Sequence, residues 1–232
     1  RRSSDLPISA ALAQLPFRHE EALVLHTVLA RRRAARAAHP TSAYPPRSGG
    51  LLDAFDARLP FELTAGQRAV GAEIAADLAG TTPMQRLLQG DVGSGKTVVA
   101  LRAMLQVVDG GGQAALLAPT EVLAAQHARS VRDLLGDLGA GGMLGAAEQS
   151  TRVELLTGSL TATERRATLA RIASGEAGII IGTHALLSDT VQIPFLGLAV
   201  VDEQHRFGVD QRDSLARGVH TLVMTATPIP RT

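Results

Sequence analysis

Short, almost entirely apolar runs alternate with helical patterns over most of the chain. Nearly every position in these runs is apolar, rather than every second one. Strands that are buried on both faces have this pattern, whereas a strand exposed on one face alternates. We therefore predict strands at Arg86–Gln89, Ala114–Ala118, Val153–Leu156, Ile179–Ile181, Leu198–Val201 and Leu222–Met224.

Helical patterns occupy the intervals between these runs. They include Thr97–Val108, Val122–Leu135 and Ala162–Ala173. An alternation of strands and helices predicts an α/β fold, with a parallel sheet that helices cover on both faces. Ligands of such sheets bind beyond the carboxyl ends of the strands. We therefore expect the residues that bind ligands or carry out chemistry to follow each apolar run directly.

The first part of the chain follows a different pattern. From His19 to Ala38, apolar residues recur at helical spacing, and arginines, including Arg31 to Arg33, gather near the end of this segment. Such a charge run favours a solvated helix end over a DNA groove. The next stretch, HPTSAYPPRSGG, has the composition of a linker. We expect residues 1–58 to hold the tail of an upstream domain, a linking helix and this linker, and residues 59–232 to form a compact lobe.

Composition narrows the class of protein. Hydrophobic residues make up 45% of the 232 residues, which is enough for a sizeable core. The formal net charge of +1 neither favours nor excludes a nucleic-acid partner, so any basic surface must be local. The chain has no cysteine, which excludes disulfides and thiolate metal sites. It shows no signal-peptide pattern and no membrane-spanning apolar run, so we expect a cytoplasmic protein without a membrane partner.

The predicted strand RLLQ leads directly into a motif of the form G-x-x-x-x-G-K-[ST]. Its glycines permit a tight turn whose N–H groups face an anion, and the following helix adds its positive end. Lys96 is then placed to reach the β- and γ-phosphates, and the Thr97 hydroxyl to bind Mg²⁺. A glycine-rich surface turn is the alternative, but the strand before it and the helix after it favour a nucleotide site. The predicted site comprises Gly90, Asp91, Val92, Gly93, Ser94, Gly95, Lys96 and Thr97.

Two carboxylates end another apolar run, in the stretch VVDEQHRFG. Asp202 is placed to hold the Mg²⁺ that Thr97 also binds, and Glu203 to polarise a water in line with the γ-phosphate. Alone, the pair is better read as two solvated acids that open a loop, because Asp-Glu pairs are common. The phosphate-binding motif favours the catalytic interpretation. A kinase would also need a site for an acceptor hydroxyl, for which the sequence gives no indication.

DEQH, with GDVGSGKT upstream and MTATP downstream, resembles the motor core of superfamily-two helicases. The stretches QGDVGSGKT, LLAPTEVLAAQH, IIIGTHALL, VVDEQHRFGVDQR and VMTATPIPRT together resemble the RecG-type family over about residues 60–232. The translocase core of Mfd-type proteins is the alternative, since it shares HRFG and TATPIPRT. Gln204 and Ser94 favour the RecG type. The resemblance implies a RecA-like P-loop NTPase lobe that uses ATP and Mg²⁺ to move on branched or duplex DNA in fork remodelling, recombination and repair.

The resemblance also implies roles for single residues. Gln67 resembles the glutamine that reads the adenine edge, with Phe61 as a stacking partner. Gln204 and His205 resemble the residues that link the nucleotide to the cleft between motor lobes. Thr225, Ala226 and Thr227 resemble the motif that couples hydrolysis to DNA movement. Each has a plainer alternative. Gln67 reads as an exposed polar residue early in a helix and His205 as a structural histidine. The stretch from Thr225 to Thr227 reads as a plain strand end.

DNA contacts are expected from the loops after the other strands. These loops are small and bear hydroxyl groups, and the one at Thr120 opens a helix whose N–H groups suit a phosphate. Each alone reads equally well as an ordinary capping turn, but three on one edge beside a nucleotide site favour DNA. The candidates are Thr120, Thr157, Gly158, Gly182 and Thr183. With five Phe, one Tyr and no Trp, the chain offers few stacking platforms, which favours contacts to the phosphate backbone.

The resemblance implies further domains beyond this chain. The chain begins with Arg1 rather than Met and stops at Thr232 without a closing element. We expect a DNA-reading wedge domain before Arg1 and a second motor lobe after Thr232. In the resembled family that second lobe supplies an arginine to the γ-phosphate, so we expect the chain alone to bind ATP–Mg²⁺ with little turnover. Two other functions remain open, a P-loop ATPase that moves a protein partner and a catalytically silent nucleotide-binding module.

Overall fold

The computed structural model of the chain describes residues 40–142, 147, 149–188, 190–202 and 218–226. The chain divides into a unit Arg1–His39 and a compact unit Pro40–Thr232, and the fold below is that of the second. The predicted helix from His19 to Ala38, with its arginines, lies outside the described residues.

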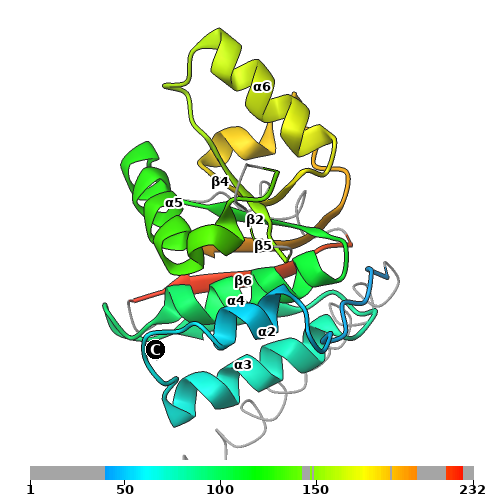
Figure 1. The fold of residues 1–232 in the computed structure, drawn as a ribbon, viewed down its shortest axis with the longest axis vertical. Coiled ribbons are helices and arrows are strands. Elements are labelled where there is room, and N and C mark those ends of the chain that lie inside the picture. Colours follow the sequence, from blue (N-terminus) through cyan, green and yellow to red (C-terminus); the bar gives the residue numbers. More distant parts are fainter. Residues whose placement is uncertain (1–39, 143–146, 148, 189, 203–217, 227–232) are drawn as a thin grey trace, which may run out of the picture. The chain divides into compact units, whose positions relative to one another are not determined.

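A six-stranded sheet forms the centre of the compact unit (Figure 1). Its strand order is β1-β6-β5-β2-β4-β3, and every neighbouring pair is parallel. All six predicted strands are confirmed, with small shifts at their ends. They are β1 (Gln85–Gln89), β2 (Gln113–Leu117), β3 (Arg152–Leu156), β4 (Ala177–Gly182), β5 (Leu196–Asp202) and β6 (His220–Thr225).

The three predicted helices within this unit are also confirmed. They are α4 (Lys96–Asp109), α5 (Glu121–Leu135) and α6 (Ala162–Ala173). The structure adds α2 (Leu51–Asp56) and α3 (Ala65–Leu78), and two short 3-10 helices, η1 (Gly136–Gly139) and η2 (His184–Leu187). None of the helices in the described part of the chain has the length and apolar content to span a bilayer.

Alternate side chains of the central strands enter two apolar clusters, one on each face of the sheet. On β2, Leu116 packs in the cluster that holds the buried side chains of α4 and α5, while its neighbour Leu117 packs in the cluster that holds Ile172 of α6. Helices α2 and α3 pack against α4 (Figure 1). Helices therefore cover both faces, as the uninterrupted apolar runs predict.

Residues 40–58 pack with the lobe, contrary to the linker and the starting point near Leu59 that their composition indicated. Tyr44 is buried, and its ring lies so close to Gly110, Gly112 and Gly197 that an added methyl group at any of these would collide with it. Leu51 and Phe55 of α2 are also buried, in the apolar cluster that holds the side chains of α4 and α5. Composition missed this because proline and glycine are frequent in anchored loops as well as in free linkers.

Candidate nucleotide-binding site

The carboxyl ends of the parallel strands line one edge of the sheet and divide it into two halves. The ends of β1, β6 and β5 form what we call the nucleotide half, and those of β2, β4 and β3 the loop half. Gln89 is in register with Thr225, and Asp202 with Met224. The Gly90 N–H also donates to the Thr225 carbonyl oxygen over 3.2 Å. Since neighbouring strands lie about 4.8 Å apart, the phosphate loop and Asp202, two strands away, lie on the order of 10 Å apart.

The phosphate loop runs from the end of β1 to the start of α4. Gly93 and Gly95 have φ angles of 81° and 79°, in the left-handed region that glycine adopts without strain. The Ser94 N–H donates to the Asp91 carbonyl oxygen over 3.1 Å and closes the turn. The N–H groups of Gly93, Gly95 and Lys96 make no hydrogen bond to any described residue. Donors left free at a helix N-terminus are the groups that an anion satisfies, so the loop fits a phosphate chain.

The ammonium group of Lys96 lies back over its own loop. Its Nζ donates to the carbonyl oxygens of Gly90 and Asp91 over 2.7 and 2.8 Å. An ammonium has three N–H donors, so one of them remains for a phosphate oxygen without breaking either bond. The predicted contact with the β- and γ-phosphates is compatible with this position and stays a prediction.

Gln67 is tied to the phosphate loop by its side-chain amide. Its Oε1 accepts from the Thr64 N–H over 2.9 Å, and the Gln67 N–H donates to Thr64 Oγ1 over 3.2 Å, which is a capping box at the start of α3. Its Nε2 donates to the Ser94 carbonyl oxygen over 3.0 Å. The stretch TAGQ carries the capping-box pattern, so this structural role was readable in the sequence. Phe61, a few residues earlier, is 45% exposed, and the adenine contacts of both residues stay predictions.

Asp202 is the last residue of β5, as predicted. Its Oδ2 lies 2.7 Å from Nε2 of His127 on α5, and the two side chains are only 17% and 15% exposed. The other carboxylate oxygen, Oδ1, has no hydrogen bond to a described residue. The sequence analysis did not single out His127, although it ends the stretch LLAPTEVLAAQH, because nothing local indicates a partner 75 residues away. Glu203, Gln204, His205 and Thr227 lie outside the described residues.

The predicted DNA loops all lie in the loop half, but their hydroxyl groups have local partners. Thr120 is exposed and caps α5, since its Oγ1 accepts from the Leu123 N–H over 3.3 Å. Thr183, which follows Gly182 at the end of β4, is 4% exposed and caps η2. Thr157 is 3% exposed, and the N–H of the exposed Gly158 donates to Glu121 Oε1 over 2.8 Å. The capping alternative therefore describes Thr120 and Thr183, and Thr157 and Thr183 do not present their hydroxyls at the surface.

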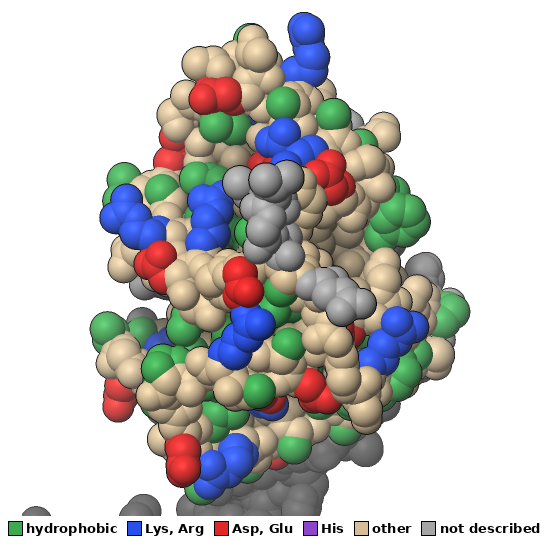
Figure 2. Space-filling view, in the orientation of Figure 1, with side chains coloured by type: hydrophobic (Ala, Val, Ile, Leu, Met, Phe, Trp, Pro, Cys, Tyr) green, Lys and Arg blue, Asp and Glu red, His purple; other side chains and the backbone are tan. Residues whose placement is uncertain are grey.

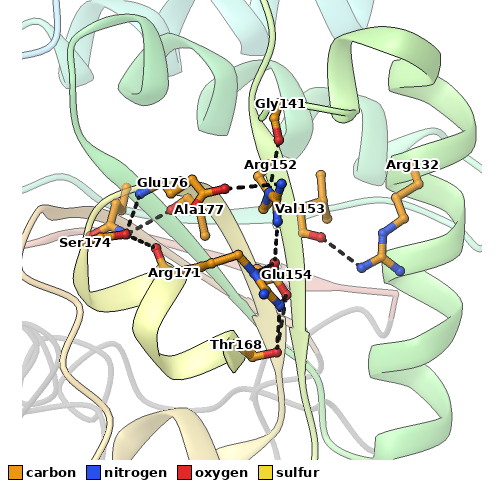
Figure 3. A network of polar contacts seen from close by, with 11 residues as sticks. Arg132, Gly141, Arg152, Val153, Glu154, Thr168, Arg171, Ser174, Glu176 and Ala177 are labelled. Carbon is orange, nitrogen blue, oxygen red and sulfur yellow. Dashed lines mark hydrogen bonds and ion pairs between the residues drawn. The ribbon is translucent and has the colours of Figure 1, made fainter. Parts of the chain in front are cut away.

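Strand β3, which leads into the loop at Thr157, is fixed from both sides (Figure 3). Glu154 is 8% exposed and accepts from the guanidinium of Arg171 on α6. On the other side, Arg132 of α5 donates to the Val153 carbonyl oxygen over 2.8 Å. These contacts fix the edge strand of the sheet. They also engage the guanidinium groups of Arg132 and Arg171 within the lobe. On the face shown in Figure 2, basic and acidic side chains are interspersed.

A magnesium ion at this edge would be held by Thr97, at the start of α4, and by Asp202. Within the described ranges, no group of three or more His, Asp or Glu side chains gathers in a way that could hold a metal ion. Mg²⁺ is commonly bound through one or two carboxylates together with substrate phosphates and waters. The donor set therefore suits a magnesium ion that arrives with a nucleotide, and not a metal cage built by the protein alone.

Comparison with known proteins places these features in a family. The model of the DEAD/DEAH box helicase family matches residues 64–232. The ATP-dependent DNA helicase RecG of Mycobacterium leprae (strain TN) is 57% identical over 219 residues, which are 92% of this chain and 30% of that protein. The protein of the same name from Synechocystis sp. (strain ATCC 27184 / PCC 6803 / Kazusa) is 46% identical over 228 residues, 97% of this chain and 26% of that one.

A solved structure of RecG bound to a three-way DNA junction superposes with a TM-score of 0.74 and 39% identity, over 91% of this chain and 27% of that one. The chain thus spans less than a third of the length of these relatives. Because the family model covers well over half of the chain, including the phosphate loop and Asp202, the chain belongs to the DEAD/DEAH box helicase family.

Proposed function

We propose that this chain is the ATP-binding motor lobe of a RecG-type DNA helicase, which couples ATP hydrolysis to movement on branched or duplex DNA in fork remodelling, recombination and repair in the cytoplasm. The observation that carries the proposal is the division of the sheet edge, with the phosphate loop and Asp202 on one half and the loops after β2, β4 and β3 on the other. The names of the relatives and the junction-bound structure support the same substrate.

In this proposal the nucleotide half binds ATP as its Mg²⁺ complex. The free N–H groups of the phosphate loop and the third donor of Lys96 bind the phosphate oxygens. Thr97 and Asp202 hold the Mg²⁺, which neutralises charge on the phosphates during transfer. Glu203 is the general base that polarises the attacking water.

The loop half is proposed to contact the sugar-phosphate backbone of DNA without reading its sequence. Thr120 is exposed at the N-terminus of α5, where backbone N–H groups suit a phosphate. Gly158, which is exposed, is then proposed to allow a close approach of the DNA backbone, while the buried Gly182, Thr157 and Thr183 support their loops from within. Thr225 and Thr227 are proposed to transmit hydrolysis to DNA movement. The partners in the complete protein are proposed to be a second motor lobe and a wedge domain.

The decisive experiment measures ATP hydrolysis by the complete protein with and without a three-way DNA junction. Stimulation by the junction, lost in a Lys96→Ala variant that still binds the junction, is the expected result. Hydrolysis that DNA does not stimulate would favour an ATPase that acts on a protein partner. No hydrolysis under any condition would favour a silent nucleotide-binding module.

A further inference from the structure

A hydrogen bond crosses the boundary between the two halves of the sheet edge. It joins His127 Nε2 on α5, from the loop half, to Asp202 Oδ2 at the end of β5, from the nucleotide half, over 2.7 Å. A carboxylate oxygen accepts hydrogen bonds, so Nε2 must carry the proton and donate it. With exposed fractions of 15% and 17%, both side chains are largely shielded from water, which otherwise competes for the same groups.

The helix that carries His127 is fixed in rotation and position. Ala124, Ala128, Val131 and Leu135 follow one another at helical spacing and are all buried. The guanidinium of Arg132 adds a hydrogen bond of 2.8 Å to the Val153 carbonyl oxygen. His127 therefore reaches Asp202 from a rigid support rather than from a loop.

Among the described residues, His127 is the one partner of the Asp202 carboxylate, and it holds a single oxygen. Oδ2 is occupied by His127, and Oδ1 makes no hydrogen bond to any described residue. An unsupported aspartate rotates freely about its side-chain bonds, and each metal-binding geometry must then be selected from many. Carboxylates that bind metal ions are commonly held by a hydrogen-bond donor behind them, and loss of that donor weakens metal binding about 10- to 100-fold.

We propose that His127 is a positioning residue for Asp202, which fixes Oδ2 and so presents Oδ1 to the magnesium ion of the bound nucleotide. The inference rests on the proposed function, in which Asp202 is the carboxylate that holds this ion. It assigns a role in metal binding to a residue of α5 that touches neither the nucleotide nor the metal.

The test measures binding of Mn²⁺ to the complete protein in the presence of ADP, by electron paramagnetic resonance, in wild type, His127→Ala and His127→Gln. The dissociation constant for Mn²⁺ is expected to rise about 10- to 100-fold in His127→Ala. Glutamine places an amide N–H near the position of Nε2, so His127→Gln is expected to restore binding to within a few-fold of wild type. ADP affinity in EDTA is expected to be equal in all three proteins, because the phosphate loop is untouched.

Arg132→Ala is the matched control, because it removes a tertiary hydrogen bond of the same helix without touching Asp202. It is expected to lower the melting temperature and leave the Mn²⁺ affinity as in wild type. Wild-type Mn²⁺ affinity in His127→Ala, no recovery in His127→Gln, or an equal loss in Arg132→Ala would each overturn the positioning role. If wild type itself bound no Mn²⁺ with ADP, the proposed function would fail and this inference with it, a result distinct from the other three.

Discussion

Gln67 of α3 donates a hydrogen bond of 3.0 Å from its side-chain amide to the carbonyl oxygen of Ser94, in the middle of the phosphate loop. The oxygen of the same amide accepts from the Thr64 N–H and caps α3. One side chain thus joins the start of a helix to the loop proposed to bind ATP. The loop is therefore bonded to a residue in the first turn of α3, with the rest of that helix and β1 between them in the sequence.

Gln67→Glu separates the two roles of this side chain. Glutamate keeps the oxygen that caps the helix but loses the donor to Ser94, and it brings a negative charge near the proposed phosphates. The lost hydrogen bond is present without nucleotide and contributes about 0.5–1.5 kcal/mol to stability, so the melting temperature is expected to fall slightly. The added charge near the proposed phosphates is expected to lower ATP affinity at least about 3- to 10-fold. Titration calorimetry and thermal unfolding measure the two. An unchanged ATP affinity would show that the Ser94 contact does not matter for the nucleotide.

Gln67→Ala is the companion variant. It removes the cap as well as the donor, and loss of a helix cap costs about 0.5–2 kcal/mol. Both stability and ATP affinity are therefore expected to fall. A variant that lost stability but kept ATP affinity would limit Gln67 to its role in α3.

Lys96 is the single lysine in a chain that otherwise uses arginine for its cationic side chains. A compact ammonium can donate to the two loop carbonyl oxygens and keep a third donor for a phosphate, whereas a planar guanidinium has its donors in a fixed fork. Both Lys96→Ala and Lys96→Arg are therefore expected to lose nucleotide binding. The hydrogen bonds that Lys96 gives up lie near the surface, so the cost in stability is expected to be about 1–3 kcal/mol.

The same single lysine allows a direct test of where the nucleotide binds. Acylation of the 232-residue chain modifies Lys96 and the N-terminal amine, which mass spectrometry of peptides separates. ATP is expected to slow acylation of Lys96 and to leave that of the N-terminus unchanged. Equal rates with and without ATP would place the nucleotide elsewhere.

The strands of the fold could be predicted where burial on both faces makes nearly every residue of the strand apolar. β2 and β4 are buried at every residue, so their apolar runs identified them without knowledge of their neighbours. The phosphate loop was predictable because its chemistry requires a contiguous motif. Contacts between distant segments were not: nothing local indicates that His127 meets Asp202, or that Tyr44 fills a space lined by glycines.

Two predictions from the sequence were misled by features that only the tertiary structure determines. The proline- and glycine-rich stretch around Tyr44 reads as a linker because composition does not reveal whether its aromatic ring has a docking place. The loops after β3 and β4 were predicted to bind DNA because they carry hydroxyl groups. Thr157 and Thr183 are in fact buried, and the sequence does not show this, since their burial depends on the tertiary structure around them.

The two acids of the DEQH stretch are expected to fail in different ways in the complete protein. Glu203→Gln keeps the shape of the side chain and loses its basicity, so ATP binding is expected to persist while hydrolysis slows by roughly two orders of magnitude or more. Asp202→Asn is expected to raise the Mg²⁺ concentration needed for half-maximal hydrolysis. Stopped-flow binding and steady-state turnover distinguish them. Loss of ATP binding in Glu203→Gln, with normal residual turnover, would exclude Glu203 as the base.

His220 is expected to make the stability of the lobe depend on pH in the mildly acidic range. It is fully buried, accepts from the Met84 N–H through Nδ1 over 3.1 Å and faces the Ser42 carbonyl oxygen with Nε2 at 3.1 Å. Burial lowers its pKa below the ordinary value of 6.5, although the Ser42 hydrogen bond and Asp77 act in the opposite direction. Protonation would also set an N–H against the N–H of Met84, so the folded lobe holds this histidine neutral.

The sign follows from where the proton binds. Below about pH 6.5 the unfolded chain takes up a proton on this histidine that the folded chain does not, so the free energy of unfolding falls as the pH drops from 6.5 toward the lower folded pKa. Above 6.5 the residue contributes no pH dependence. Melting temperatures of wild type are therefore expected to fall between pH 7.5 and 5.5 by more than those of His220→Gln, which is neutral throughout. Tyr44 reports the transition, because it is the only tyrosine in a chain without tryptophan and its ring lies edge-on to His220 at 6.0 Å. Equal pH dependence in the two proteins would show that the folded lobe accommodates the protonated ring.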